Sequence, residues 1–209
     1  MVWRDWFRTI SLAGVPVAGA SMSSVKAPGR RAILRAGIGL GILGLSDLTD
    51  AQENPAAMRP KPGDLLVKVD DQKAIPLTPD DIPLAGDQTM AWAMDPVDKT
   101  IRSGERLNRI LLARFPVEQL SSETRARAAE GVVAYTAICT HAGCEVTDWI
   151  VDKQFVFCPC HDSTFDPKDN GKVVDGPAPR MLPALPLKMV EKKLVVAGPF
   201  TARIYFEKD

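Results

Sequence analysis

Short apolar runs dominate the pattern of hydrophobic and polar positions along this chain. They are rich in valine, leucine, isoleucine and phenylalanine and end at glycine, proline or charged residues, which is typical of short β-strands. The runs lie at residues 64–69, 110–115, 132–138, 155–157, 185–190 and 194–197. The charged triplet at 191–193 separates the last two runs, so they are expected to form a hairpin.

Helical signals are sparse by comparison. One helix is expected over residues 122–130, because a serine-rich start precedes it and Gly131 follows it. Many short strands with one short helix predict an all-β fold, an antiparallel β-sandwich or barrel, here named the base domain. Residues 83–109 carry few periodic signals and are expected to lie over the base domain. Residues 52–209 are long enough for one domain with a buried core.

The chain opens with a pattern of its own. A basic stretch containing Arg30, Arg31 and Arg35 precedes an uncharged run at residues 36–45. Ten residues rise about 15 Å as a helix, half the thickness of a bilayer core. The run is therefore too short to span a membrane, but it suits the apolar region of a secretory signal. A cytosolic amphipathic helix is the alternative, although the glycines and alanines of the run disfavour one.

The paired arginines resemble a twin-arginine export signal. Small residues at 49–51 would suit a signal peptidase that cuts before Gln52. Residues 1–51 are therefore predicted to be an export signal. A start at Met22 would give a more usual layout, so residues 1–21 are interpreted as an upstream start.

Charge excludes one class of partner. The chain carries 26 basic and 26 acidic side chains, and residues 52–209 hold 20 and 23 of them. No basic patch or arginine-rich tract is present, so nucleic acid is not an expected partner.

The candidate chemistry is concentrated in one window. All four cysteines and both histidines lie within residues 139–161. They form two groups of three, Cys139, His141 and Cys144 followed by Cys158, Cys160 and His161. Two thiolates suit one iron and two imidazoles suit another, so the pattern fits a two-iron, two-sulfur cluster with unequal ends. Gly143 and Pro159 indicate that both groups lie in tight turns.

Two other interpretations use the same residues. Two cysteines with two histidines make a good tetrahedral zinc site, but this would leave two cysteines unexplained, and the spacing of Cys139 and His141 is tighter than usual for zinc. A plain disulfide framework is the second alternative, since four cysteines allow three pairings. That framework would leave both histidines without a role.

The window resembles the Rieske family of iron–sulfur proteins, in particular its respiratory, disulfide-containing branch. The resemblance implies that Cys139 and Cys158 hold one iron of a 2Fe–2S cluster, and that His141 and His161 hold the other. It also implies a disulfide between Cys144 and Cys160, which joins the first ligand loop (residues 139–144) to the second (residues 158–163).

Further residues match the Rieske pattern around the cluster. Ser163 stands where the family's serine donates to a bridging sulfide. Gly176, Pro177 and Pro179 belong to a stretch, residues 176–180, that resembles the family's cluster-covering proline loop. The resemblance implies a cluster-binding subdomain at about 135–182, inserted between strands of the base domain.

Three positions depart from the pattern of the cytochrome bc complex subunit. Ala142 and Asp162 stand where that subunit commonly has leucine and glycine, and Phe165 stands where it has a tyrosine that donates to a ligand sulfur. Loss of that donor and the charge of Asp162 both favour the oxidised cluster, although Asp162 could simply face water, where its effect is screened. Asp162, Ser163 and Phe165 are therefore the expected tuning residues.

Phe165 and the cleavable signal resemble the small subunit of arsenite oxidase. The expected function is one-electron transfer in the periplasm, from a catalytic partner subunit of molybdenum oxidase type to a c-type cytochrome. The alternatives are the iron–sulfur subunit of a quinol–cytochrome c reductase with a cytochrome b-like partner, and a zinc-stapled binding module. Export in the folded state is expected by the twin-arginine route, with membrane association if the signal is retained.

Overall fold

The structure is a computed structural model that describes residues 54–205. The predicted export signal therefore lies outside the described residues. Within residues 54–205, none of the helices has the length and apolar character needed to cross a membrane.

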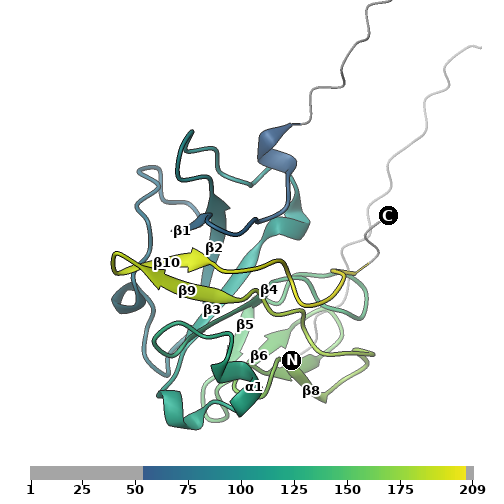
Figure 1. Ribbon diagram of the computed structural model, residues 1–209. Coiled ribbons are helices and arrows are strands. Elements are labelled where there is room, and N and C mark those ends of the chain that lie inside the picture. The colour runs from purple at the N-terminus through teal and green to yellow at the C-terminus, as the bar shows by residue number, and fades with distance from the viewer. Residues whose placement is uncertain (1–53, 206–209) are drawn as a thin grey trace, which may run out of the picture. The chain divides into compact units, whose positions relative to one another are not determined.

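The base domain is one antiparallel sheet of six strands (Figure 1). In spatial order these are β4 (Val132–Thr136), β3 (Ile110–Arg114), β2 (Thr89–Met94), β1 (Leu65–Lys68), β10 (Lys193–Val196) and β9 (Leu187–Val190). Just before β9, Ala184 forms a β-bridge with Tyr135 of β4. The two edges of the sheet therefore approach each other, and the sheet curls towards a barrel.

A second antiparallel sheet lies in the chain between β4 and β9. Its strands are β5 (Asp148–Ile150), β6 (Phe155–Cys158), β7 (Ser163–Asp166) and β8 (Lys172–Asp175), paired in that order. The fold is thus all-β and antiparallel, with an inserted second sheet and one short helix, which confirms the predicted fold class.

Two expectations about the base domain were wrong. The stretch 83–109 contains β2, which pairs with β1 on one side and β3 on the other and so lies inside the sheet rather than over it. The helix α1 covers only Ser122–Arg125. It cannot continue to residue 130, because Ala129 pairs with Val132 and Glu130 has a φ of 49°, which lies outside the right-handed helical region.

The remaining short elements are single turns of 3-10 helix. They are η1 (Pro55–Ala57), η2 (Pro79–Asp81), η3 (Arg106–Asn108) and η4 (Val117–Gln119). The turn η3 immediately precedes β3, and it contributes to the metal centre described below.

Strands β3 and β4 are buried on both faces. Leu111 and Tyr135 belong to an apolar cluster that also contains Cys139, Cys158 and Phe165. Ile110 and Ala134 belong to a separate cluster formed with residues of β1, β9 and β10. The base sheet therefore has one core of its own and shares the other with the inserted sheet.

Residues 55–58 are tied to the base sheet by buried polar groups. The Arg102 side chain is fully buried, bonds to both carboxylate oxygens of Asp64 and donates to the Pro55 carbonyl. Asn108 of η3 donates to the carbonyl of Met58 at 2.7 Å. A buried charge needs such partners, because an unpaired one costs several kcal/mol.

Candidate metal centre

The first ligand loop follows β4. Ile138 and Glu145 form a β-bridge at its base, and the backbone N–H of Cys139 donates to the carbonyl of Cys144 at 2.8 Å. Gly143 closes the turn with a φ of 73° and donates to the carbonyl of Cys139 at 3.0 Å. A side chain at this position would be strained by the positive φ.

The second ligand loop is the hairpin between β6 and β7. Cys158 ends β6 and pairs with Ser163, which begins β7. The four residues between them carry Cys160 and His161, which are both exposed. Asp162 follows with a φ of 60°, which explains how it can stand where the resemblance leads one to expect glycine, since aspartate tolerates the left-handed region.

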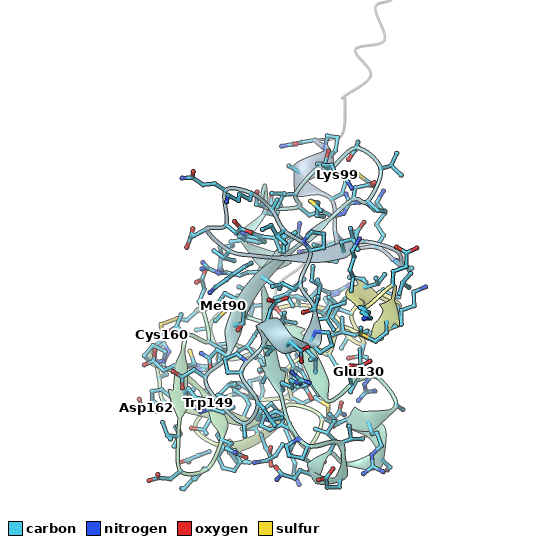
Figure 2. All side chains as sticks on the ribbon, turned by 90° about the vertical axis from the view of Figure 1, so that its left-hand side faces the viewer. Met90, Lys99, Glu130, Trp149, Cys160 and Asp162 are labelled. Atoms are coloured by element: carbon cyan, nitrogen blue, oxygen red, sulfur yellow. A yellow bond between two sulfur atoms is a disulfide. The ribbon has the colours of Figure 1, made fainter. Side chains whose placement is uncertain are left out.

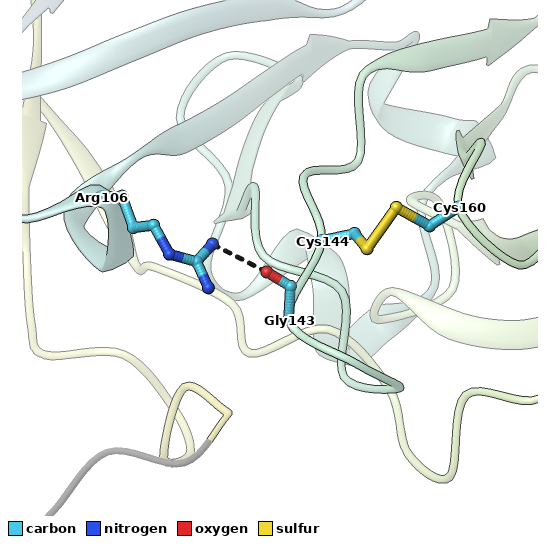
Figure 3. The surroundings of a disulfide bond; sticks show 4 residues. All are labelled: Arg106, Gly143, Cys144 and Cys160. Atoms are coloured by element: carbon cyan, nitrogen blue, oxygen red, sulfur yellow. Dashed lines mark hydrogen bonds between the residues drawn. A yellow bond between two sulfur atoms is a disulfide. The ribbon is translucent and has the colours of Figure 1, made fainter. Parts of the chain in front are cut away.

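The two loops meet through the predicted disulfide. Cys144 and Cys160 are bonded, with a Cα–Cα distance of 6.4 Å (Figure 3). Cys139 and Cys158 are free and buried. The rings of His141 and His161 lie edge to face with centroids 4.7 Å apart. The fold therefore brings the six residues of the window together, two buried thiols on the inner side and two imidazoles nearer the surface.

A different trio of ligand-type atoms also lies close together. The ligand atoms of Cys144, Cys160 and His161 are within 4.8 Å of one another. Sulfur atoms bonded to each other cannot act as thiolates, so this proximity reflects a disulfide beside His161 and not a metal site.

The environment of the inner thiols disfavours an isolated charge. Burial raises the pKa of the Cys158 thiol, and the neighbouring Cys139 raises it further, while the backbone N–H groups of Cys160 and His161 lower it. Two adjacent buried thiolates would repel each other without a cation between them. Iron would supply that positive charge.

Two buried polar atoms also fit a cluster. Ser163 is fully buried, and its hydroxyl has no hydrogen-bond partner; Nδ1 of His141 is buried and likewise unpartnered. Buried polar groups are normally satisfied, so a buried hydroxyl and a buried imidazole nitrogen beside two thiols suit the sulfide and the iron of a cluster as partners. The residues present therefore fit a 2Fe–2S cluster.

The proline loop packs against the second ligand loop. A Cβ on Gly176 would stand 2.6 Å from the carbonyl oxygen of Asp162 and from Cα of Ser163, so this position has no room for a side chain. A further contact could not be read from the sequence pattern: the Thr140 hydroxyl donates to the Arg180 carbonyl at 2.6 Å. Residues 176–180 are thus held close to both ligand loops.

Arg106 is a second residue that the sequence pattern did not reveal. Its Nη1 donates to the carbonyl of Gly143 at 2.7 Å, across 37 positions of the chain (Figure 3). Beside it, Arg109 forms an ion pair with Glu145 at 3.0 Å. The region around η3 therefore contacts the first ligand loop at Gly143 and the residue that follows the loop, Glu145.

The exposed residues of the site lie at one edge of the molecule. Cys160 and Asp162 lie near each other in Figure 2, away from Lys99 and Glu130. Asp162 is exposed, as the solvent-facing interpretation of this residue requires. Water screens its charge, so its effect on the site is expected to be small.

Phe165 is fully buried in the same apolar cluster as both free cysteines. Tyr135 belongs to the same cluster and does carry a hydroxyl, but this hydroxyl donates to the carbonyl of Pro167 at 2.8 Å. Tyr135 therefore does not replace the missing donor at position 165.

We expect Phe165→Tyr to raise the midpoint potential of the bound cluster. A phenol hydroxyl donating to the Cys139 sulfur would favour the reduced state by about 1 kcal/mol, or on the order of 40 mV at 59 mV per tenfold change. Protein-film voltammetry measures the shift, and Phe155→Tyr, in the neighbouring strand, is the matched control. An unchanged or lowered potential with an intact spectrum would show that position 165 does not tune the cluster.

Fold and site together define an iron–sulfur protein of the electron-transfer class. The profile of the Rieske [2Fe-2S] domain matches residues 117–186. The chain is 32% identical over 126 residues to the cytochrome bc1 complex Rieske iron-sulfur subunit of Streptomyces lividans, covering 59% of this chain and 72% of that protein. It is 41% identical over 75 residues to a putative respiratory nitrate reductase subunit Rieske of Haloferax mediterranei, covering 35% of this chain and 33% of that one.

The chain therefore belongs to the Rieske iron–sulfur protein family, and it carries a Rieske 2Fe–2S cluster for electron transfer. It spans only 35% of the corresponding subunit of Streptomyces coelicolor. Among solved structures, the soluble domain of a Rieske protein from Sulfolobus acidocaldarius overlaps 47% of this chain and 65% of its own, at 21% identity and a TM-score of 0.38.

Proposed function

We propose that this chain is the iron–sulfur subunit of a periplasmic redox complex and passes one electron at a time from a catalytic partner to a c-type cytochrome. The observation that carries the proposal is the pairing of two buried free thiols with two histidines on disulfide-linked loops. When bound, the cluster supplies one-electron redox chemistry at a potential above that of all-cysteine clusters.

Each residue of the site has a definite part in this proposal. Cys139 and Cys158 hold the inner iron as thiolates, and His141 and His161 hold the outer iron as neutral imidazoles. The buried Ser163 hydroxyl donates towards the cluster. The bond between Cys144 and Cys160 keeps the two ligand loops together.

The histidines are the natural contact with a partner. His161 is exposed and His141 is partly exposed, whereas both free cysteines are buried. Because Nδ1 of His141 is the buried nitrogen, its Nε2 is the nitrogen left for a neighbouring group. A donor or acceptor that docks at this edge would meet imidazole nitrogens first.

A second candidate is the iron–sulfur subunit of a quinol–cytochrome c reductase. The names of several relatives favour it, including the Streptomyces lividans subunit. In that case a partner such as cytochrome b would bring a quinol to the histidine edge, and an imidazole nitrogen would accept its proton. The buried Phe165, in place of a hydroxyl donor, favours the first candidate instead.

Export in the folded state is part of the proposal. A cluster is assembled where iron and sulfide are supplied, whereas a disulfide persists in an oxidising compartment. A twin-arginine signal over residues 1–51 would satisfy both conditions. A retained signal would leave the protein associated with the membrane.

Quinol-dependent reduction of cytochrome c in membranes distinguishes the two candidates. Cells that lack this protein are complemented with the wild type or with Cys139→Ser, which serves as the matched variant without a ligand. Equal quinol-dependent rates in both strains support the first candidate, and loss of the rate with Cys139→Ser supports the second. Fractionation of the same cells tests the periplasmic location, and a colourless purified protein without a Rieske spectrum would overturn both candidates.

A further inference from the structure

A residue of the base domain forms a direct hydrogen bond to the first ligand loop. Arg106 is in η3, and its Nη1 donates to the carbonyl of Gly143 at 2.7 Å (Figure 3). Gly143 lies between His141 and Cys144, a proposed ligand and a disulfide cysteine. The contact therefore joins two segments that lie 37 positions apart in the sequence, next to the disulfide.

Gly143 is enclosed as well as bonded. A Cβ placed on it would stand 2.7 Å from ring carbons of Tyr205 and 3.3 Å from Nη2 of Arg106. Its own N–H is taken by the carbonyl of Cys139 at 3.0 Å. The carbonyl of Gly143 remains free to accept a hydrogen bond from the base domain, and the Arg106 guanidinium donates it.

We propose that Arg106 is a positioning residue that holds the first ligand loop and shifts the cluster towards its reduced state. The proposal rests on the function proposed above, because it requires a redox-active cluster at the free cysteines and histidines. It concerns a residue outside the window of cysteines and histidines, supplied by the base domain.

The orientation of one peptide group gives the first physical reason. The C=O and N–H of a trans peptide point in opposite directions. Because Arg106 fixes the carbonyl of Gly143, the N–H of Cys144 is directed away from Arg106. Figure 3 shows the Cys144 side chain leaving the loop on that other side, towards Cys160. The positive end of the peptide dipole therefore faces the side of the loop on which the disulfide lies.

Charge gives the second reason. Reduction adds one negative charge to the cluster, so a nearby cation favours the reduced state. The neighbouring Arg109 pairs with Glu145 at 3.0 Å, and this pair adds little net charge. Arg106 bonds to a neutral carbonyl, so its positive charge is not cancelled by this contact. The residue is exposed, so water screens this charge, and the hold on the loop is the larger of the two effects.

The test compares Arg106→Gln, Arg106→Lys and a matched control, Arg114→Gln. Arg114 also donates to a backbone carbonyl at 2.7 Å, that of Pro79, and pairs with Asp80. It ends β3 opposite Val132, whereas the ligand loop follows Thr136 at the other end of β4. The control therefore removes the same charge and the same kind of bond from the far end of the strand pair.

We expect Arg106→Gln to bind the cluster and to lower the ratio of reduced to oxidised protein about threefold at the wild-type midpoint, a shift of about 30 mV at 59 mV per tenfold change. Arg106→Lys should retain most of the wild-type ratio, and Arg114→Gln should match the wild type. Cluster release to an iron chelator should be faster in Arg106→Gln than in the control. Voltammetry, electron paramagnetic resonance and absorbance measure the three quantities.

An unchanged potential in Arg106→Gln with an intact spectrum would overturn the proposal, as would an equal shift in Arg114→Gln. Cluster loss in Arg106→Gln with retention in Arg106→Lys would support the positioning role. Cluster loss in both, with Arg114→Gln intact, would make Arg106 an assembly residue and overturn the tuning role. Absence of a Rieske spectrum from the wild type would defeat the proposed function, a separate result.

Discussion

His161→Ala is expected to abolish the Rieske-type signal in electron paramagnetic resonance, and His141→Ala should do the same. The chain has only two histidines, and their rings lie 4.7 Å apart beside two buried free thiols. Alanine supplies no nitrogen ligand, and an iron left with an open position is readily lost or rebuilt with other ligands.

Asp162→Asn is the matched control for this experiment. Asp162 adjoins His161 and is exposed, so the substitution should leave the spectrum at full strength. Iron content and visible absorbance should fall with the signal in the histidine variants. A full-strength Rieske spectrum in either histidine variant would remove that histidine from the ligand set.

Cys139→Ser should lose the cluster completely, whereas Cys144→Ser should keep a cluster that is easily lost. The first change removes a buried thiol of the proposed ligand set, and the second removes only the bond to Cys160. The disulfide closes a loop with a sequence separation of 16, so it should stabilise the fold by roughly 3 kcal/mol in the chain-entropy model.

Thermal unfolding and cluster release measured on both variants separate the two roles. Wild-type protein treated with a thiol reductant should behave like Cys144→Ser, since it loses the same bond. If both variants lost the cluster completely and at the same rate, the division into ligand and disulfide cysteines would be wrong.

Much of the site could be predicted because its chemistry depends on rare residues. The six members of the window were recognisable from spacing alone, and the disulfide from the resemblance. Arg106 and Thr140 were not recognisable, because each acts through a backbone carbonyl that long-range folding brings near. No local pattern of residues in the sequence predicts a hydrogen bond between a side chain and a distant backbone carbonyl.

The fold was predictable where a strand is buried on both faces. Residues of β3 and β4 form nearly continuous apolar runs for this reason. Strand β2 was missed because alanines fill its buried positions 91 and 93, which leaves a weak hydrophobic signal. Strands β7 and β8 have four residues each, too few to establish a period.

The single turn η3 also has a mechanical consequence. Asn108 at one end of it bonds to the carbonyl of Met58, and Arg106 at the other bonds to the carbonyl of Gly143. Tension applied to the chain ahead of Met58 therefore reaches the first ligand loop through the three residues of η3, and the base sheet through Arg102, which donates to the Pro55 carbonyl. A force on residues 55–58 would thus act on the turn that carries His141.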